Sequence, residues 1–375
     1  MDQQKNNLAE VAKVFLKLGV IGFGGPAVHI AMMEEEVVRK RAWMTDEHFL
    51  DLIGATNLIP GPNSTELTMH IGHERAGWKG LVTAGFCFIL PAVIITAVVA
   101  LAYQRYGQLP YLQPFIFGIK PAVIAVVVAT MIALGRKALK SAALGILGLA
   151  SGLAVLAGAN EITVLFAAGF IGVFLCLIQP GRNNAYGIFP FTLLQINQAA
   201  LDTSSLKLFL IFLKIGSILY GSGYVLFAFL NAELVAKGLL SKQQLIDAVA
   251  VGQVTPGPVF SSATFIGWQV GGLGGAVAAT VGIFLPSFFF VALLNPIVPK
   301  LRKSKVMGAF LDSVNIASIA IILSVIIEVS REVLLDPRTI LIAITSFIIT
   351  FYFKKINIAF IITGGAILGY VLSFT

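Results

Sequence analysis

The sequence has few charged residues. Only 12% of its 375 residues are Asp, Glu, Lys or Arg, whereas soluble domains carry about 25%. Apolar residues make up 57% of the chain and mean hydropathy is +0.91. Runs such as residues 80–103 and 122–134 are long enough, with their flanks, to cross a hydrocarbon layer of roughly 30 Å. The composition excludes an ordinary soluble domain and predicts an all-α polytopic membrane protein.

Cysteine and histidine are also scarce. Cys87 and Cys176 lie inside apolar runs, where we interpret them as reduced packing residues. The four histidines show no spacing typical of a zinc or iron–sulfur site, and no nucleophile–base pair falls at membrane depth. We therefore expect no metal, no cofactor and no enzymatic activity.

The net charge of +8 does not indicate a nucleic-acid partner. Most basic residues flank apolar segments, as the anchors of membrane proteins do. The expected partner is the lipid bilayer of the cytoplasmic (inner) cell membrane. The N-terminus has no basic region followed by a compact apolar core, so we expect no removable signal peptide.

The sequence contains an internal repeat. The stretch FLKLGVIGFGGPAVHIAMMEEEVV (residues 15–38) recurs as FLKIGSILYGSGYVLFAFLNAELV (residues 212–235), and Pro60-Gly61-Pro62 recurs as Pro256-Gly257-Pro258. Further matches follow in the same order, which indicates a tandem duplication. We predict a first repeat over 1–182, a connector over 183–206 and a second repeat over 207–375.

Each repeat contains five apolar segments. They are 14–33, 80–103, 114–135, 141–158 and 162–179 in the first half, and 208–230, 272–294, 306–329, 339–353 and 356–374 in the second. A Pro-Gly-Pro region follows the first segment of each half. Its arms in the first half, 47–58 and 64–73, are each too short to cross a bilayer as a helix. They form either a re-entrant hairpin or one broken crossing.

The distribution of positive charge favours the hairpin. With five crossings in each half the second half is inverted, and Lys and Arg divide 16 to 7 between the two faces. Such an asymmetry is expected when the basic face is cytoplasmic. The prediction is five plus five crossings as inverted repeats, with both termini outside and with Lys5 and Lys13 on the less basic face.

The Pro-Gly-Pro break has properties suited to an anion. Non-helical backbone survives in a bilayer only where protein or a water-filled cavity satisfies it, and Pro60 and Pro62 end any arriving helix. A helix that restarts near Asn63 presents free N–H groups and a partial positive charge. Further breaks are expected at 24–26 and 221–223. Four broken helix ends could thus surround one midplane site, as in many secondary transporters.

The candidate anion-binding residues lie at these breaks, together with one lysine inside an apolar segment. They are Gly24, Gly25, Asn57, Gly61, Asn63, Ser64, Thr65, Lys120, Ser222, Gln253, Gly257, Ser261 and Ser262. Simpler interpretations stay open, because Asn63-x-x-Glu66 fits a capping box and the hydroxyls could bond only to backbone. Lys120 either contacts the anion or forms an internal salt bridge.

Three residues are candidates for coupling to protons, namely Glu66, His29 and Glu36. Their pattern does not define a relay. Lys17 and Lys214 recur in both halves, and side chains that reach to the membrane interface would explain them as well as a functional role.

Three blocks of the sequence resemble a known family. FGGPAVHIAMMEEE and LDLIGATNLIPGPNSTELTMHIGHERAGWKG look like signature blocks of the chromate ion transporters, and VGQVTPGPVFSSATFIGWQVGGLGGAVAAT is similar to the second domain of their long-chain type. Ser222 departs from the family pattern, which has a small glycine-type residue there.

The resemblance implies export of chromate with sulfate as a competing anion, chromate resistance, and antiport with protons. The residues themselves support a narrower statement, a membrane site for a small oxyanion. An uptake carrier or an anion channel for sulfate or another oxyanion is the alternative. The sequence leaves open whether the chain forms a homodimer.

Overall fold

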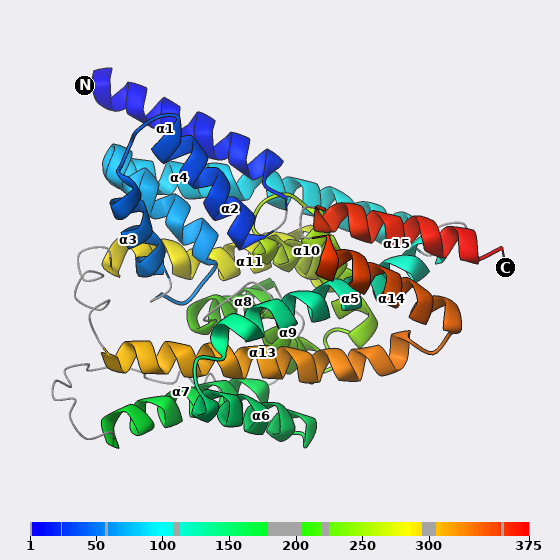
Figure 1. Ribbon diagram of the computed structural model, residues 1–375. Helices are drawn as coiled ribbons and strands as arrows, with labels where there is room; N and C mark the ends of the chain where they lie inside the picture. Colours follow the sequence, from blue (N-terminus) through cyan, green and yellow to red (C-terminus); the bar gives the residue numbers. More distant parts are fainter. Residues whose placement is uncertain are drawn as a thin grey trace.

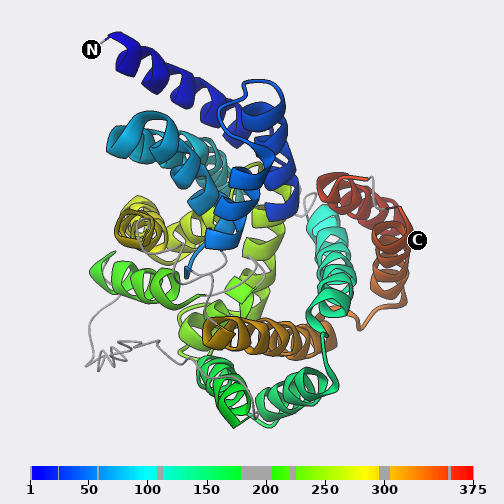
Figure 2. The same ribbon diagram turned by 60° about the vertical axis from the view of Figure 1, so that its left-hand side comes forward.

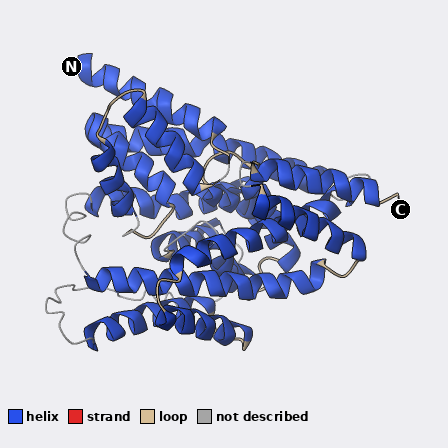
Figure 3. Ribbon diagram, viewed as in Figure 1, coloured by secondary structure: helices blue, strands red, loops and turns tan. Residues whose placement is uncertain are grey.

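The computed structural model describes residues 2–23, 25–56, 59–107, 113–178, 205–219, 225–294, 305–353 and 356–374. All regular structure in these ranges is helical, as predicted (Figures 1 and 3). The first half contains α1 (Asp2–Ile21), α2 (Pro26–Met33), the π-helix η1 (Glu34–Arg39), α3 (Asp46–Thr56), α4 (Asn63–Tyr106), α5 (Gln113–Ala138), α6 (Ala142–Leu156) and α7 (Glu161–Ile178). The second half contains α8 (Ser205–Ile218), α9 (Val225–Leu230), the π-helix η2 (Asn231–Val235), α10 (Lys242–Val254), the 3-10 turn η3 (Val259–Ser261), α11 (Ser262–Leu294), α13 (Lys305–Val333), α14 (Pro337–Tyr352) and α15 (Ile358–Leu372). Apart from its last two residues, the predicted connector lies outside the described residues.

Five helical stretches among the described residues are long and apolar enough to cross a membrane. They are Asn63–Tyr106, Gln113–Ala138, Glu161–Ile178, Val259–Leu293 and Val306–Val333. Large apolar side chains remain exposed on the outer helices, for example Ile146 and Leu149 on α6 and Phe174 on α7. Apolar surface of this extent requires a lipid or protein partner, in agreement with a membrane protein.

The first apolar segment, predicted over 14–33, is not one crossing. α1 ends at Ile21, and Lys17 on α1 forms an ion pair with Glu36 at 2.9 Å. In one continuous helix these residues would be about 28 Å apart, so the chain folds back between α1 and α2. The break predicted at 24–26 is therefore a reversal of direction. The second half repeats it, because Lys214 on α8 pairs with Glu233 at 2.6 Å.

The reversal corrects the predicted position of the N-terminus. Glu10 on α1 forms ion pairs with Arg75 at 2.8 Å and with Arg41 at 3.9 Å. The start of α1, with Lys5 and Lys13, therefore lies at the basic end of the molecule and not opposite it. The C-terminus lies at the other end (Figure 1), where Arg338 donates to the Leu372 carbonyl at 3.3 Å.

The helices that follow the Pro-Gly-Pro breaks contain a matched sharp turn. In α4 it falls at Gly77, with a φ of 61°, and in α11 at Gly272, with a φ of 60°. Glycine adopts this conformation without the steric penalty of other residues. A Cβ added to Gly72 would lie 2.4 Å from the Gly80 carbonyl oxygen, although a straight helix would separate these residues by about 12 Å. The first arm of α4 thus folds back onto the long arm that follows.

The two halves exchange their last helices. α6 and α7 of the first half pack along α13 of the second, while α14 and α15 of the second half pack along α5 of the first (Figures 1 and 2). Close approach of small residues makes this packing possible. A Cβ added to Gly118 on α5 would lie 2.1 Å from the Gly365 carbonyl oxygen on α15, as in helix contacts through small residues in membranes.

The two Pro-Gly-Pro breaks are held by reciprocal hydrogen bonds. The Gly61 amide donates to the Leu219 carbonyl at the end of α8 at 2.7 Å, and the Gly257 amide donates to the Gly22 carbonyl after α1 at 2.8 Å. Each break is therefore satisfied by the first helix of the opposite half. This is how irregular backbone is accommodated inside a membrane protein, and it places both breaks at the centre of the molecule.

Candidate functional site

The start of α4 is the best-defined helix end at the centre. Pro62 is its N-cap residue, with a φ of −80°, and no side chain caps the helix. The Thr65 and Glu66 amides bond to the Pro62 carbonyl at 2.8 and 3.1 Å. Asn63 is the first helical residue, so the alternative capping-box interpretation does not apply. The first-turn amides carry the partial positive charge of the helix N-terminus.

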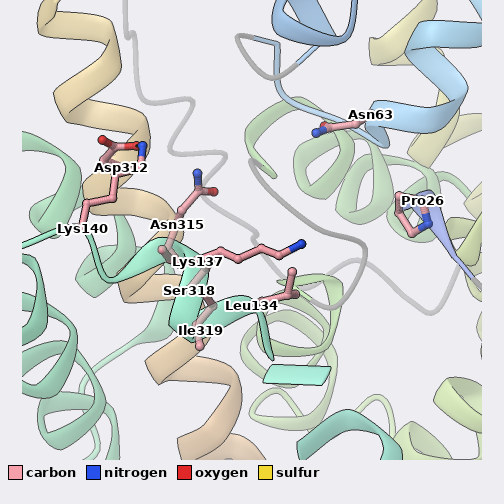
Figure 4. A pocket seen from close by; sticks show the side chains of 10 residues that line it. Pro26, Asn63, Leu134, Lys137, Lys140, Asp312, Asn315, Ser318 and Ile319 are labelled. Carbon is pink, nitrogen blue, oxygen red and sulfur yellow. Dashed lines mark hydrogen bonds and ion pairs between the residues drawn. The ribbon is translucent and has the colours of Figure 1, made fainter. Parts of the chain in front are cut away.

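A cavity of about 290 Å³ lies directly at this helix start (Figure 4). It is lined by Pro26, Asn63, Leu134, Lys137, Ala138, Lys140, Asp312, Asn315, Ser318 and Ile319. Two helices begin at its wall, α4 at Asn63 and α2 at Pro26. Gly25, just before α2, has a φ of 82°, a conformation that favours glycine. The cavity therefore faces two helix N-terminal ends, where anions are favoured.

Two lysines add positive charge to the cavity. Figure 4 shows the Lys137 side chain extending from α5 into the space between Asn315 and Pro26. Lys140 pairs with Asp312 at 2.7 Å, whereas Lys137 forms no ion pair within the described part of the chain. An exposed ammonium beside two helix N-terminal ends makes this cavity suited to a small anion.

The cavity contains residues that the sequence analysis did not single out. In the sequence, Lys137 is interpreted only as one of the basic residues that flank apolar segments. Asn315 and Ser318 lie on α13, away from any break. One signal was present in the sequence, because Asn315 is the repeat counterpart of Lys120. The contribution of Lys137 could not be read from the sequence, since it depends on the packing that places the end of α5 at the same cavity as the starts of α2 and α4.

His29 connects the break after α1 to the start of α4. Its Nε2 atom lies 2.8 Å from the Gly22 carbonyl oxygen and its Nδ1 atom lies 3.3 Å from Ser64 Oγ. A carbonyl can only accept, so Nε2 carries the proton that donates to Gly22. In the neutral ring, Nδ1 then accepts from the Ser64 hydroxyl. His29 thus fixes Ser64 beside Asn63 at the edge of the cavity.

Glu66 is completely buried between the two halves. Its Oε1 atom accepts a hydrogen bond from Ser287 Oγ of α11 at 3.3 Å, and its Oε2 atom has no partner among the described residues. Gly61 packs against it, since a Cβ there would lie 2.2 Å from Oε1. No cation contacts this carboxyl within the described residues. Burying an ionised carboxylate without a cation costs several kcal/mol.

Glu36 has the opposite surroundings. It lies in η1, outside the five membrane-length stretches, and contacts Lys17 at 2.9 Å, Lys40 at 3.2 Å and the Arg41 guanidinium. These cations, Lys17 first, lower the pKa of Glu36 to about 2 against the opposing effect of burial. Of the three candidates for proton coupling, Glu36 is the one whose surroundings keep it ionised near neutral pH.

Two of the candidates in the second half, Gly257 and Ser261, lie at the contact between the halves. Gly257 has a φ of 87° and donates to Gly22, while Ser261 Oγ accepts from Thr96 at 3.3 Å. Gln253 and Ser262 are buried, as is Thr65 in the first half. None of these five lines the cavity. Gly24, Asn57 and Ser222 lie outside the described residues.

Lys120 is not at the cavity either. It lies 17 positions before Lys137 on α5, about 25 Å along the helix, and its Nζ atom is 3.6 Å from Asp247 Oδ1 on α10. Tyr103 donates to Asp247 Oδ2 at 2.6 Å. In this conformation Lys120 is thus part of an internal salt bridge, one of the two interpretations of the sequence.

Comparison with known proteins connects this architecture to a family. The sequence profile described as "Chromate transporter" matches residues 9–173 and again residues 206–370. The chain belongs to the chromate transporter family. The profile thus matches the chain twice, once in each half. This membership places the chain among membrane transporters.

Similar proteins span both repeats or one of them. A chromate transport protein of Cupriavidus metallidurans is 30% identical over 97% of this chain and 93% of its own length. A probable chromate transport protein of Synechococcus elongatus is 28% identical over 97% of this chain and 95% of its own length. An uncharacterised transporter of Bacillus subtilis is 28% identical over 49% of this chain and 88% of its own length, so one repeat alone can make up most of a related protein. No solved structure matches the chain.

Proposed function

We propose that this protein is a secondary transporter that exports chromate, or a similar oxyanion dianion such as sulfate, across the cytoplasmic membrane in exchange for protons. The observation that carries the proposal is the cavity that is lined by Lys137 together with the N-terminal ends of α2 and α4. An oxyanion needs hydrogen-bond donors and positive charge at close range, and this cavity supplies both. Asn63 is its polar lining residue in the first turn of α4, and the neighbouring Ser64 is buried behind it against His29.

The two halves act in this proposal as inverted repeats. Their reciprocal hydrogen bonds, Gly61 to Leu219 and Gly257 to Gly22, join the two breaks around one pseudo-twofold centre. The exchanged packing of the last helices supports the same symmetry. In transporters built this way, substrate binds near the repeat interface, and the repeats move against one another to change its access.

Glu66 is the group that we assign to proton exchange. It is buried between the halves next to the Gly61 break, so a relative movement of the halves would change its exposure to water. His29 is the second candidate, because it bridges the break after α1, at Gly22, and the start of α4, at Ser64. Glu36 is left out of the proposed proton path, since its three cationic neighbours hold its charge.

The direction of transport follows from charge. The cavity lies at the end of α5 that carries Arg136 and Lys137, with Lys140 just after it, and we take this basic face as cytoplasmic. A dianion that leaves a cell with a negative interior gains about 4.6 kcal/mol per 100 mV, twice the value for one charge. Proton exchange would add to a movement that is already downhill.

The decisive experiment measures radiolabelled chromate flux in proteoliposomes, with an imposed potential and with or without a pH gradient. We expect flux that sulfate inhibits and that follows both gradients. Flux that follows voltage alone would remove the proton exchange and keep the oxyanion site. Graded conductance without counterflow would instead identify a channel. Absence of chromate flux under either gradient would contradict the proposed substrate.

Two variants connect this flux to the cavity. Lys137→Gln and Asn63→Ala should each lower flux by about tenfold or more, because loss of one charge-assisted contact costs about 1.5–3 kcal/mol. Lys79→Gln is the matched control, since it removes an exposed positive charge at the same end of the molecule, outside the cavity. Equal flux in all three variants at matched protein levels would move the substrate site elsewhere.

A further inference from the structure

The cavity has a repeat-related counterpart that is filled by apolar side chains. The lining residues Asn315, Ser318 and Ile319 on α13 correspond in the repeat to Lys120, Val123 and Ile124 on α5, and Leu134 corresponds to Val329. Val123, Ile124 and Val329 surround a void of only about 20 Å³. Phe227, Leu245 and Val325 fill the rest of this region. Residues of both repeats line each of the two regions, and an open cavity in one corresponds to apolar packing in the other.

Lys120 lies beside this closed region, and the Asp247 carboxylate neutralises its charge. Its side chain is 15% exposed and that of Asp247 is 5% exposed. Asp247 is held firmly by the Tyr103 hydroxyl at 2.6 Å, whereas its distance to the Lys120 ammonium is 3.6 Å. A direct ammonium–carboxylate hydrogen bond is shorter, about 2.7–2.9 Å. Asp247 therefore neutralises Lys120 without a tight hydrogen bond to it.

The burial of Lys120 and its loose contact with Asp247 are both expected if the Asp247 carboxylate substitutes for a substrate. A buried lysine without a counter-anion costs several kcal/mol, so Lys120 needs an anion whenever this region is closed. A carboxylate offers the same kind of oxygen acceptor as chromate or sulfate. Because Tyr103 rather than Lys120 fixes Asp247, an arriving oxyanion can take over the ammonium while Asp247 keeps its hydroxyl partner.

We propose that Lys120 is a ligand of the oxyanion in the opposite-facing conformation, and that Asp247 is a tethered carboxylate that replaces the oxyanion when the transporter is empty. This inference rests on the proposed oxyanion transport. It assigns the Lys120 end to the outward-facing state, in which the void beside Val329 opens and the cavity beside Lys137 closes. The Lys120–Asp247 pair lets the empty protein close at this end.

The proposal separates two kinds of flux. Net export requires the empty protein to return, whereas exchange of labelled for unlabelled chromate requires only the loaded protein to change its direction. With Asp247→Asn, the empty protein would retain an unneutralised Lys120 and stay open at that end. Net export should fall about tenfold, since 1.4 kcal/mol of lost neutralisation already has this effect, while exchange should stay within about twofold of wild type.

Lys120→Met provides the complementary result. It removes the proposed ligand, so both net export and exchange should fall by about tenfold or more. Asp336→Asn is the matched control, because Asp336 forms an ion pair with Arg338 at 2.7 Å at the same end of the molecule and lies outside both cavities. Both fluxes should be unchanged in this control.

A labelling experiment tests, without any transport measurement, whether the Lys120–Asp247 pair closes this end of the molecule. In a chain whose Cys87 and Cys176 are replaced by Ala, the substitutions Leu134→Cys and Val329→Cys place thiols at equivalent positions of the two repeats. A membrane-impermeant maleimide should label Leu134→Cys rapidly and Val329→Cys slowly. Adding Asp247→Asn should speed labelling of Val329→Cys several-fold.

The outcomes distinguish this inference from the proposed function. Equal losses of net export and exchange in Asp247→Asn, or labelling of Val329→Cys that does not change, would overturn the tethered carboxylate. Normal exchange in Lys120→Met would overturn Lys120 as a ligand. If the wild type carries no chromate, the proposed function fails, yet the labelling rates still report whether the Asp247 pair closes this end.

Discussion

The two repeats of this chain share their architecture. The sharp turns at Gly77 and Gly272 have φ values of 61° and 60°, and each Pro-Gly-Pro amide bonds to the first helix of the other half. The helical reversals are fastened in both halves by a lysine and a buried glutamate. What the repeats retain in common is therefore the geometry of the broken helices.

The chemistry of the two repeats differs. The repeat counterpart of His29 is Leu226, and that of Lys137 is Glu332. Glu66 follows the first Pro-Gly-Pro break, whereas the second break continues as the 3-10 turn Val259–Ser261, which has no acidic residue. His29, Lys137 and Glu66 thus occur in one repeat only, on a scaffold that occurs twice. The comparison predicts that changes to shared features affect folding and that changes to single-copy residues affect transport.

The largest effect is expected at the shared glycine contacts. Gly72→Ala and Gly267→Ala each place a Cβ within 2.4 Å of a backbone carbonyl oxygen on the neighbouring arm, and overpacking of this kind costs about 1–3 kcal/mol or more. Both variants should lose thermal stability in detergent and accumulate poorly in the membrane. Gly308→Ala is the control, since nothing lies within 4 Å of its added Cβ. Full stability of Gly72→Ala would contradict the folded-back arm.

A single-copy residue gives the next largest effect. Glu66→Gln preserves shape and removes the carboxyl that follows the first break, so the protein should fold and move chromate down a voltage. Flux driven by a pH gradient should fall about tenfold or more, equivalent to about 1.4 kcal/mol. Glu34→Gln, which changes an exposed carboxylate paired with Arg39, is the control. Unaltered pH-driven flux in Glu66→Gln would exclude this residue from proton exchange.

The limits of the sequence analysis follow the same division. The breaks at the Pro-Gly-Pro motifs and the restart at Asn63 were predictable, because proline and glycine act locally on the backbone. The reversal after α1 was not, since Lys17 and Glu36 are 19 positions apart and hydropathy is the same for a reversed and a continuous segment. Local sequence also could not show that Asn315, Lys137 and Asn63 line the same cavity, since they lie on three separate helices.

His29 gives a smaller effect that separates two roles. His29→Leu introduces the residue of the second repeat and removes the contacts with Gly22 and Ser64. A buried hydrogen bond contributes about 1 kcal/mol, so flux should fall about threefold to tenfold with the fold retained. His29→Gln can still donate to the Gly22 carbonyl. Recovery of flux in His29→Gln would assign His29 to positioning, and persistent loss of pH-driven flux alone would assign it to the proton path.

The smallest expected effect concerns Glu36, a shared feature at the rim of the molecule. Its pKa is lowered from 4.5 to about 2 by Lys17 and the neighbouring cations, so its contribution to stability is complete above pH 4.5 and is lost as the pH falls through about 2. Lys17 is half exposed, and water screens the pair, so Glu36→Gln should lower the free energy of unfolding by about 1–2 kcal/mol at pH 7.

Thermal midpoints of Glu36→Gln and wild type, measured in detergent from pH 7 to pH 3, test this sign. The difference between the two proteins should be constant down to about pH 5 and should shrink at lower pH, because the unfolded wild type then binds a proton at Glu36 while the folded carboxylate stays ionised down to about pH 2. Chromate flux between pH 5 and pH 8 should follow the same pH profile in both. A change in that profile would mean that Glu36 exchanges protons during transport, and a feature shared by both repeats would then carry chemistry as well as structure.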